Sequence, residues 1–335
     1  MRDRNKGLLL AVLAPLIFFA PTLAGGSGAV YSAFVLMAIF ASMAYGLDLI
    51  VSDLGEVSLA HTVFFAVGSY TTALLATRTG AGGWTTLAAA IVAALMFALL
   101  MGLVTLRLRE FVFSLVTYAI AVVAATIAQN WTFLGGSDGL RGIPPLSLAL
   151  PGVTLGAAND RELWPFAFGL LVVVLYLVDR FRHSRLGSAA IMTHLNPRLA
   201  IVSGIDPQQV RLKVFLFSAP ITASAGWLYA YQRAYVSADI LDSYFLILML
   251  TAVVLIGRRL LLGPLIATVM ILTQEKFLSL GGYADKIILG GVLIATLAFF
   301  PRGLIGFARP LAELVRRLLG RTADQGAGGA SIKSR

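Results

Sequence analysis

Apolar residues occur along this chain in runs of about twenty, the helix length needed to cross ~30 Å of hydrocarbon. Backbone groups in lipid must be hydrogen-bonded within the protein, so these runs should be helices. The alternating segments of about ten residues that mark an outer-membrane barrel are absent from the sequence. The pattern predicts an all-α integral membrane protein with ten spans, at residues 7–24, 30–50, 58–78, 84–106, 111–129, 163–180, 213–232, 242–257, 261–280 and 284–300.

Composition and charge support this interpretation. The chain is 59% hydrophobic and 13% charged, about half the charged fraction of a typical soluble protein. With a cytoplasmic N-terminus, twenty of the 26 Lys and Arg residues fall in the inside segments. This asymmetry predicts cytoplasmic N- and C-termini in a bacterial inner membrane. We therefore attribute the net charge of +10 to membrane topology and expect no nucleic-acid partner.

The loops and ends divide the chain further. Residues 1–307 are expected to form one transmembrane domain, with an outer loop at about 130–162 and an inside loop at about 181–212. Residues 308–335 are predicted to be a basic, partly disordered cytoplasmic tail. The first 26 residues also have the pattern of a signal peptide, but the many later spans favour an uncleaved first helix.

Covalent chemistry has little support in this sequence. There is no cysteine, and the three histidines are scattered, which excludes thiolate sites and argues against a metal centre. We expect no cofactor and no catalytic residues. No phosphate-binding loop ending in Gly-Lys-Ser/Thr is present, so ATP could drive this protein only if another chain hydrolyses it.

Polar residues interrupt the apolar pattern in two places. The first break lies between two spans, and Gly55 permits a tight turn there. Its polar members are Asp48, Asp53, Glu56, Ser58 and His61, with Ser58 placed to cap the following helix. The second break contains Gly257, Arg258, Gly263 and Pro264. The first break is either a polar inside turn or an interrupted helix that lines the pathway or contacts a partner subunit. The similar positions of the two breaks in the two halves predict a two-fold internal repeat.

The inside loop 181–212 is too long for a simple turn. Asn196-Pro197 and Asp206-Pro207 predict short helices with capped starts. The loop is either a basic segment held at anionic headgroups or a docking element for a cytoplasmic subunit. The residues proposed for docking are Ser184, Arg185, Gly187, His194, Asn196, Arg198 and Gly204.

Several motifs, taken in order, resemble those of one family. Residues 46–70 are similar to the segment G-L-x-L-x-x-x-x-x-G-x-x-S-L-x-H-x-x-F-x-x-x-G-x-Y of permease subunits from branched-chain amino-acid ABC transporters, of the LivM type. Further matches are 107–117, 135–144, 184–187 and 300–306. Together they cover nearly the whole chain from about residue 30 to 307.

The resemblance implies a membrane subunit of an ATP-binding-cassette importer. It would work with a second homologous permease subunit, two cytoplasmic ATP-binding subunits and a periplasmic solute-binding protein. Family substrates include leucine, isoleucine and valine, and relatives carry urea, short amides and other small polar solutes. By this resemblance the inside loop contacts the ATPase and the two breaks act as gates.

The chain departs from the family pattern at two places. The inside loop at 190–200 lacks both acidic residues of the family's R-A-I-R-E-N-E segment. At 256–264, two glycines of the pattern G-G-x-G-x-x-x-G-P are replaced, one of them by an arginine. These differences indicate a divergent member with its own ATPase interface or cargo.

Two other classes of function fit the composition. A transporter acting alone would couple Asp48, Asp53 or Glu56 to protons or sodium and would take up solute without ATP. An integral membrane enzyme acting on lipid-linked sugars would need acidic or histidine clusters at one membrane face, and only the loose group between Asp48 and His61 could supply one.

Overall fold

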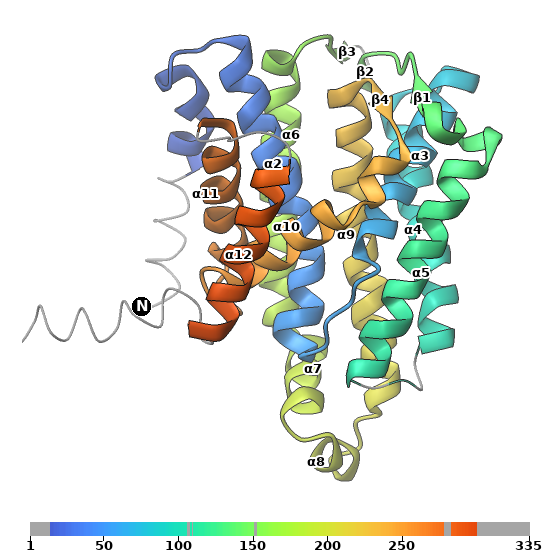
Figure 1. Cartoon of the computed structure of the whole chain (residues 1–335), viewed down its shortest axis with the longest axis vertical. Coiled ribbons are helices and arrows are strands. Elements are labelled where there is room, and N and C mark those ends of the chain that lie inside the picture. The colour runs from blue at the N-terminus through green and yellow to red at the C-terminus, as the bar shows by residue number, and fades with distance from the viewer. Residues whose placement is uncertain (1–13, 106–107, 109, 151–152, 278–282, 300–335) are drawn as a thin grey trace, which may run out of the picture.

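The computed structural model describes residues 14–105, 108, 110–150, 153–277 and 283–299. These residues form an all-α membrane protein (Figure 1) with helical segments at each of the ten predicted positions. An N-terminal helix covers Ala14–Leu23. The long helices that follow are α2 (Gly28–Asp48), α3 (His61–Thr79), α4 (Gly83–Thr105), α5 (Glu110–Asn130), α6 (Asp160–Arg182), α9 (Pro207–Arg233), α10 (Ser243–Val254), α11 (Gly263–Phe277) and α12 (Tyr283–Phe299).

Helices α2 and α9 form the centre of the bundle. Helix α2 is buried along most of its length, and α9 packs against α2, α3 and α4. Glycines allow this close approach. A Cβ added to Gly68 on α3 would overlap the backbone of Ala223 on α9, and one on Gly226 would overlap the backbone of Phe65.

The outer helices present apolar side chains to their surroundings. On α4 and α5, Leu103 is 58% exposed and Phe111 is 76% exposed, as expected for helices that face lipid. Four segments in the described part are long and apolar enough to cross a membrane by themselves: Gly28–Leu54, Gly83–Val104, Phe111–Asn130 and Asp160–Arg182.

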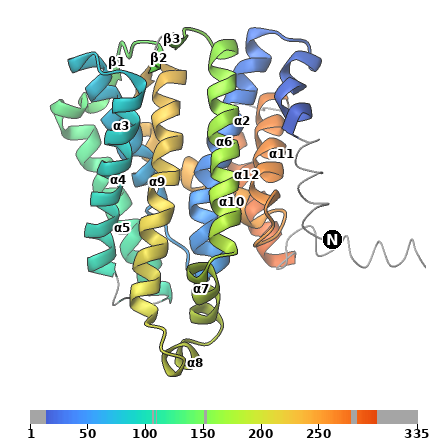
Figure 2. The ribbon, with the colours of Figure 1, turned by 180° about the vertical axis from the view of Figure 1, so that it is seen from behind.

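The two ends of the bundle carry different structures (Figures 1 and 2). One end has the short helices α7 (Arg185–Leu195) and α8 (Pro197–Val202). The opposite end has an antiparallel hairpin of β2 (Leu146–Leu150) and β3 (Val153–Ala157). In the same loop, β1 (Leu140–Arg141) pairs with β4 (Tyr235–Val236) beyond α9, and two short 3-10 turns, η2 (Thr132–Leu134) and η3 (Gly136–Asp138), precede it.

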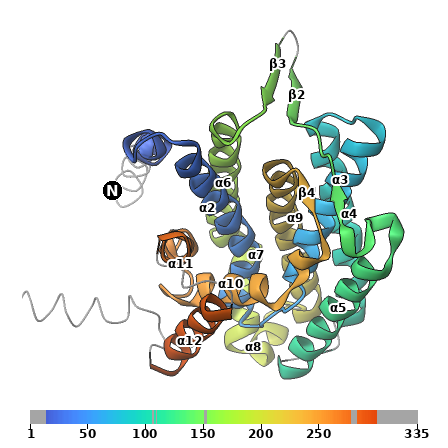
Figure 3. The same ribbon diagram turned by 45° about the horizontal axis from the view of Figure 1, so that its top comes forward.

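The chain is interrupted after each central helix. Helix α2 continues as a widened π-helical turn, η1 (Leu49–Leu54), and an extended segment then leads to α3. Helix α9 is followed by β4, a 3-10 turn η4 (Ala238–Leu241) and α10. Figures 1 and 3 show α10 crossing the bundle at an angle.

Helix α10 corrects one prediction. It has 12 residues, which rise about 18 Å, against the ~30 Å needed to cross the hydrocarbon. The predicted span 242–257 is therefore too short as a helix to cross alone. The chain connects α9 with α11 through η4, helix α10 and the non-helical residues 255–262.

Candidate gate and coupling site

The two predicted breaks lie against each other in the fold. The backbone N–H of Arg259 donates to Ser52 Oγ in the π-helical turn at 3.2 Å. The hydroxyl of Tyr45 on α2 donates to the carbonyl oxygen of Leu261 at 2.5 Å. The break at Asp53–Ser58 and the break at 257–264 thus form one joint, which is the candidate site.

Ion pairs hold this joint together. Arg182, the last residue of α6, places Nη2 2.5 Å from Asp48 Oδ2 and Nε 3.3 Å from Asp53 Oδ2. Arg259 places Nε 3.1 Å from Asp53 Oδ1. Ser52 donates its hydroxyl to Asp48 Oδ1 at 2.5 Å. We call Asp48, Asp53, Arg182 and Arg259 the ion cluster.

The two carboxylates of the ion cluster are buried. Asp48 is 1% exposed and Asp53 is completely buried. Carboxylates in such positions carry a desolvation penalty of several kcal/mol, which only well-placed counter-charges offset. Two carboxylates face two guanidinium groups, so the cluster is neutral as a whole. It joins α2, η1, the end of α6 and the α10–α11 break.

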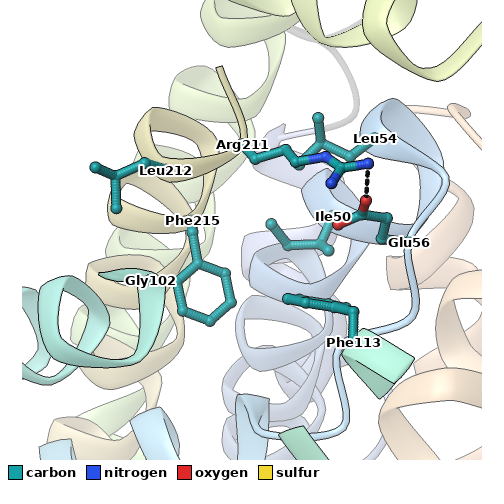
Figure 4. Close-up of a pocket in the computed structure, with 8 residues that line it drawn as sticks. All are labelled: Ile50, Leu54, Glu56, Gly102, Phe113, Arg211, Leu212 and Phe215. Atoms are coloured by element: carbon teal, nitrogen blue, oxygen red, sulfur yellow. Dashed lines mark ion pairs between the residues drawn. The ribbon is translucent and has the colours of Figure 1, made fainter. Parts of the chain in front are cut away.

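A second ion pair lies beside the first. Arg211 Nη2 is 2.5 Å from Glu56 Oε1, and Glu56 is 7% exposed. Figure 4 shows the pair above a small cavity with Phe113 and Phe215. The cavity has a volume of about 20 Å³, enough for about one water molecule. Glu56 is therefore bound to α9 through Arg211.

The segment between Gly55 and α3 is anchored by side chains. Ser114 Oγ donates to the carbonyl oxygen of Val57 at 2.7 Å, and the Leu59 N–H donates to Thr117 Oγ1 at 3.1 Å. The predicted cap by Ser58 is wrong, because Ala60 is the N-cap residue of α3 and no side chain caps it. The extended chain places Ser58 Oγ beside the His61 ring instead, 3.0 Å from Nδ1.

His61 is a fully buried link between helices. Its Nε2 lies 3.2 Å from Ser218 Oγ on α9, and its ring packs edge-on against Phe64 and Phe215. Both ring nitrogens therefore have a hydroxyl partner. This arrangement fixes the start of α3 against α9 and leaves the imidazole no open side for a ligand.

Helix α7 contacts the joint through His194. Gly55 has φ 70°, a left-handed conformation that favours glycine. A Cβ at this position would also overlap the imidazole ring of His194. Gly55 is thus required for two reasons: it adopts the left-handed backbone conformation, and its lack of a side chain leaves room for the His194 ring of α7.

The predicted docking residues shape α7 and α8. Ser184 caps α7 by accepting the Gly187 N–H at 3.1 Å, and a Cβ on Gly187 would overlap the carbonyl of Phe181. Asn196 caps α8 by accepting the Leu199 N–H at 3.1 Å. The predicted cap at Asp206 is also present, but it starts the long helix α9 rather than a short one. The remaining docking residues are Arg185 and Arg198, whose side chains are exposed, and Gly204, which has φ 77°.

The second break uses glycine and proline as the sequence predicted. Gly257 has φ 143°, and Gly263 and Pro264 begin α11, both buried. Arg258 is exposed and contributes nothing to the ion cluster. Arg259 has φ 62°, a conformation that costs a non-glycine residue of order 1–3 kcal/mol. Its ion pair with Asp53 helps to offset this cost.

Comparison with known proteins agrees with this architecture. The model of the family described as "Branched-chain amino acid transport system / permease component" matches residues 29–297. The chain belongs to this family. The LivM permease proteins of the high-affinity branched-chain amino acid transport systems of Escherichia coli K12 and Salmonella typhimurium LT2 are each 26% identical to it. The alignments cover 83% and 82% of this chain, and 70% of each relative. No solved structure matches it.

The site of the permease contains three arginines in ion pairs, Arg182, Arg211 and Arg259, that sequence reasoning did not assign to it. The sequence analysis counts Arg182, Arg211 and Arg259 among the positive charges of the inside segments and gives them no part in the site. The sequence does contain a signal for these arginines, because the three carboxylates Asp48, Asp53 and Glu56 lie close to an apolar stretch and each requires a cation. Which arginine serves which acid depends on tertiary structure.

Some predictions about the permease fall outside the described residues. These are the start of the first span, the motif at 300–306 and the tail at 308–335. In the part of the chain that the structure does describe, no three His, Cys, Asp or Glu side chains gather to hold a metal ion.

Proposed function

We propose that this permease is the membrane subunit of an ATP-driven importer, and that the joint around the ion cluster transmits ATPase movement to the transport pathway. In this proposal the α7–α8 end is cytoplasmic, and the hairpin end faces the periplasm and receives a solute-binding protein. The cargo is a branched-chain amino acid or another small polar solute. A second permease subunit and two ATP-binding subunits complete the complex.

The contact between His194 and Gly55 carries the proposal. It joins the last turn of α7 to the residue where η1 ends. Two positions away, Asp53 is tied to α6 and to the second break. A push on α7 would therefore reach both interrupted segments through side chains already in contact. Packed elements with few alternative arrangements transmit such displacements well.

The surface of α7 and α8 supports an ATPase as the partner. Four large apolar side chains at this end are exposed, between 56% and 85%: Leu195, Leu199, Ile201 and Val202. Beside them a hollow of about 400 Å³ is lined by residues from Ile201 to Gln208. Apolar side chains gathered on a surface outside the bundle are typical of a protein–protein interface.

Copurification tests this assignment. The tagged chain, purified from the cells that naturally produce it, should bring down an ATP-binding protein and a second permease. Leu195→Asp with Val202→Asp should reduce ATPase recovery at least tenfold without lowering the melting temperature, because both side chains are exposed. Leu155→Asp, at the hairpin end and 40% exposed, is the matched control and should retain the ATPase.

Two outcomes would contradict the proposal. One is a wild-type chain that recovers no ATPase and no second permease. The other is solute uptake by the purified chain in liposomes without ATP, which would favour a transporter acting alone. The structure gives that rival little support, since Asp48, Asp53 and Glu56 are each paired with an arginine.

A further inference from the structure

An apolar groove runs along the outside of the bundle beside the second break. Helices α6 and α11 both pack on α2 (Figure 3), and the groove lies between them. Its volume is about 380 Å³. The N-terminal helix, α6 and the start of α11 all contribute to its lining, which includes Ile17, Phe168, Asp179, Leu261, Leu262 and Leu265.

The groove is suited to hydrocarbon and not to water. Among its lining residues, only Tyr176 and Asp179 have polar side chains, and both lie at the same end, so water along most of its length would find no hydrogen-bond partner. Val172 is 42% exposed and Tyr176 is 60% exposed, so this face of α6 is open to the surroundings of the bundle. At this depth in a membrane the surroundings are lipid acyl chains.

The length of the groove matches one leaflet of the bilayer. From Phe168 to Asp179, α6 rises about 17 Å, and one leaflet contributes roughly 15 Å of hydrocarbon. At the end away from α7, the Phe168 ring packs edge-on against Phe18 at 5.3 Å, and Trp164 Nε1 donates to the Phe18 carbonyl oxygen at 2.9 Å. These contacts join the N-terminal helix to α6. An acyl chain would therefore enter from the α7 side and end at Phe168.

A carboxylate stands at the entrance of the groove. The Asp179 side chain is 46% exposed, and its Oδ1 lies 3.5 Å from His183 Nδ1. That nitrogen is also 2.7 Å from the backbone carbonyl oxygen of Asp179. Among the hydrogen bonds of the described residues, none is accepted by the Asp179 carboxylate. A primary ammonium group supplies both the opposite charge and the missing N–H donors.

We propose that the groove holds one acyl chain of a phosphatidylethanolamine molecule from the cytoplasmic leaflet, with the ammonium group of the lipid at Asp179. Only the choice of leaflet rests on the proposed function, which makes the α7–α8 end cytoplasmic. The chain packs on the back of the joint, because Leu261 lines the groove and its carbonyl oxygen accepts the Tyr45 hydroxyl. Bound lipid therefore stabilises the second break in the arrangement described here.

Native mass spectrometry of the purified full-length chain tests the site. The probes are phosphatidylethanolamine and phosphatidylglycerol with identical acyl chains. The wild type should retain phosphatidylethanolamine about two- to fivefold better, the ratio expected for a partly exposed ion pair. Asp179→Asn should remove this preference and leave binding of phosphatidylglycerol unchanged. Val172→Trp should fill the groove and reduce the retention of both lipids.

Matched controls separate the groove from the rest of the surface. Val173 is 54% exposed on the same helix but does not line the groove, and Asp138 is an exposed acid of the outer loop. Val173→Trp and Asp138→Asn should therefore bind both lipids as the wild type does. The site assignment fails if Val173→Trp loses as much lipid as Val172→Trp. The headgroup assignment fails if the wild type shows no preference or if Asp179→Asn keeps it.

Photocrosslinking locates the lipid independently of any variant. Phosphatidylethanolamine with a photoreactive group on its acyl chain, in mixed vesicles with phosphatidylglycerol, should label residues 168–179 and 261–265 more than residues 99–104 of α4. The α4 segment is a suitable reference because Leu100 is 61% exposed and Val104 is 65% exposed. Equal labelling of α4 would show ordinary surrounding lipid and no site. Copurification of the ATPase is independent of these results, so the transport proposal can survive the failure of this site.

Discussion

Removal of the Arg182 guanidinium should destabilise the protein strongly. Arg182→Met keeps most of the side-chain volume but leaves Asp48, 1% exposed, with only the Ser52 hydroxyl as a partner. Breaking a buried ion pair in this way costs about 3–5 kcal/mol. At roughly 2 °C per kcal/mol for a chain of this size, the melting temperature should fall by roughly 6–10 °C.

The assay is thermal unfolding of the purified protein in nanodiscs. Arg180→Met is the matched control, because Arg180 lies on the same helix with an exposed side chain 5.9 Å from the Tyr176 ring. It should change stability by less than about 0.5 kcal/mol. The double variant Arg182→Met with Asp48→Asn should recover most of the loss, because it removes the orphaned charge along with its partner.

The reasoning would be refuted by either of two results. Arg182→Met could melt within error of Arg180→Met, which would mean that the ion cluster adds nothing to stability. Alternatively, the double variant could melt below Arg182→Met, which would mean that the lost stability came from packing of the arginine stem and not from an unpaired carboxylate.

Two further predictions concern glycines. Gly55→Ala should lower the melting temperature and the uptake rate more than Gly80→Ala, because both glycines have positive φ but only Gly55 lies against the ring of His194. Adding His194→Ala to Gly55→Ala should restore part of the difference. Equal effects of Gly55→Ala and Gly80→Ala would argue against the importance of the His194 contact. Gly68→Ala should lower the melting temperature or prevent folding because its Cβ would overlap α9, whereas Gly290→Ala, with open space around it, should be neutral by the same measurement. A stable Gly68→Ala protein would show that α3 and α9 can separate.

The helical framework could be predicted because it depends on local pattern. Length and apolarity determined where the spans lie, and Asn196 and Asp206 cap helices as their position before proline predicted. The error at Ser58 has a physical cause. Three residues before α3 the chain is still extended, so its hydroxyl reaches the side chain of His61 and not the backbone of the first turn.

The pairing inside the site could not be predicted in the same way. Arg182 and Asp48 are 134 residues apart in sequence, and Arg211 lies on α9 whereas Glu56 lies in the extended segment before α3. Local pattern carries no information about such contacts. The short length of helix α10 could not be predicted for a similar reason. Its apolar composition is that of a full span, and only its packing across the bundle shows that it is not one.

The neutrality of the ion cluster has an electrical consequence. A single charge moved through the whole membrane potential exchanges about 2.3 kcal/mol per 100 mV with the field. Asp48 and Asp53 would move together with Arg182 and Arg259, and Glu56 with Arg211, so each unit carries no net charge. Displacement of the joint would therefore produce almost no gating current. In the proposed ATP-driven importer, a change of membrane voltage alone should leave the import rate unaltered.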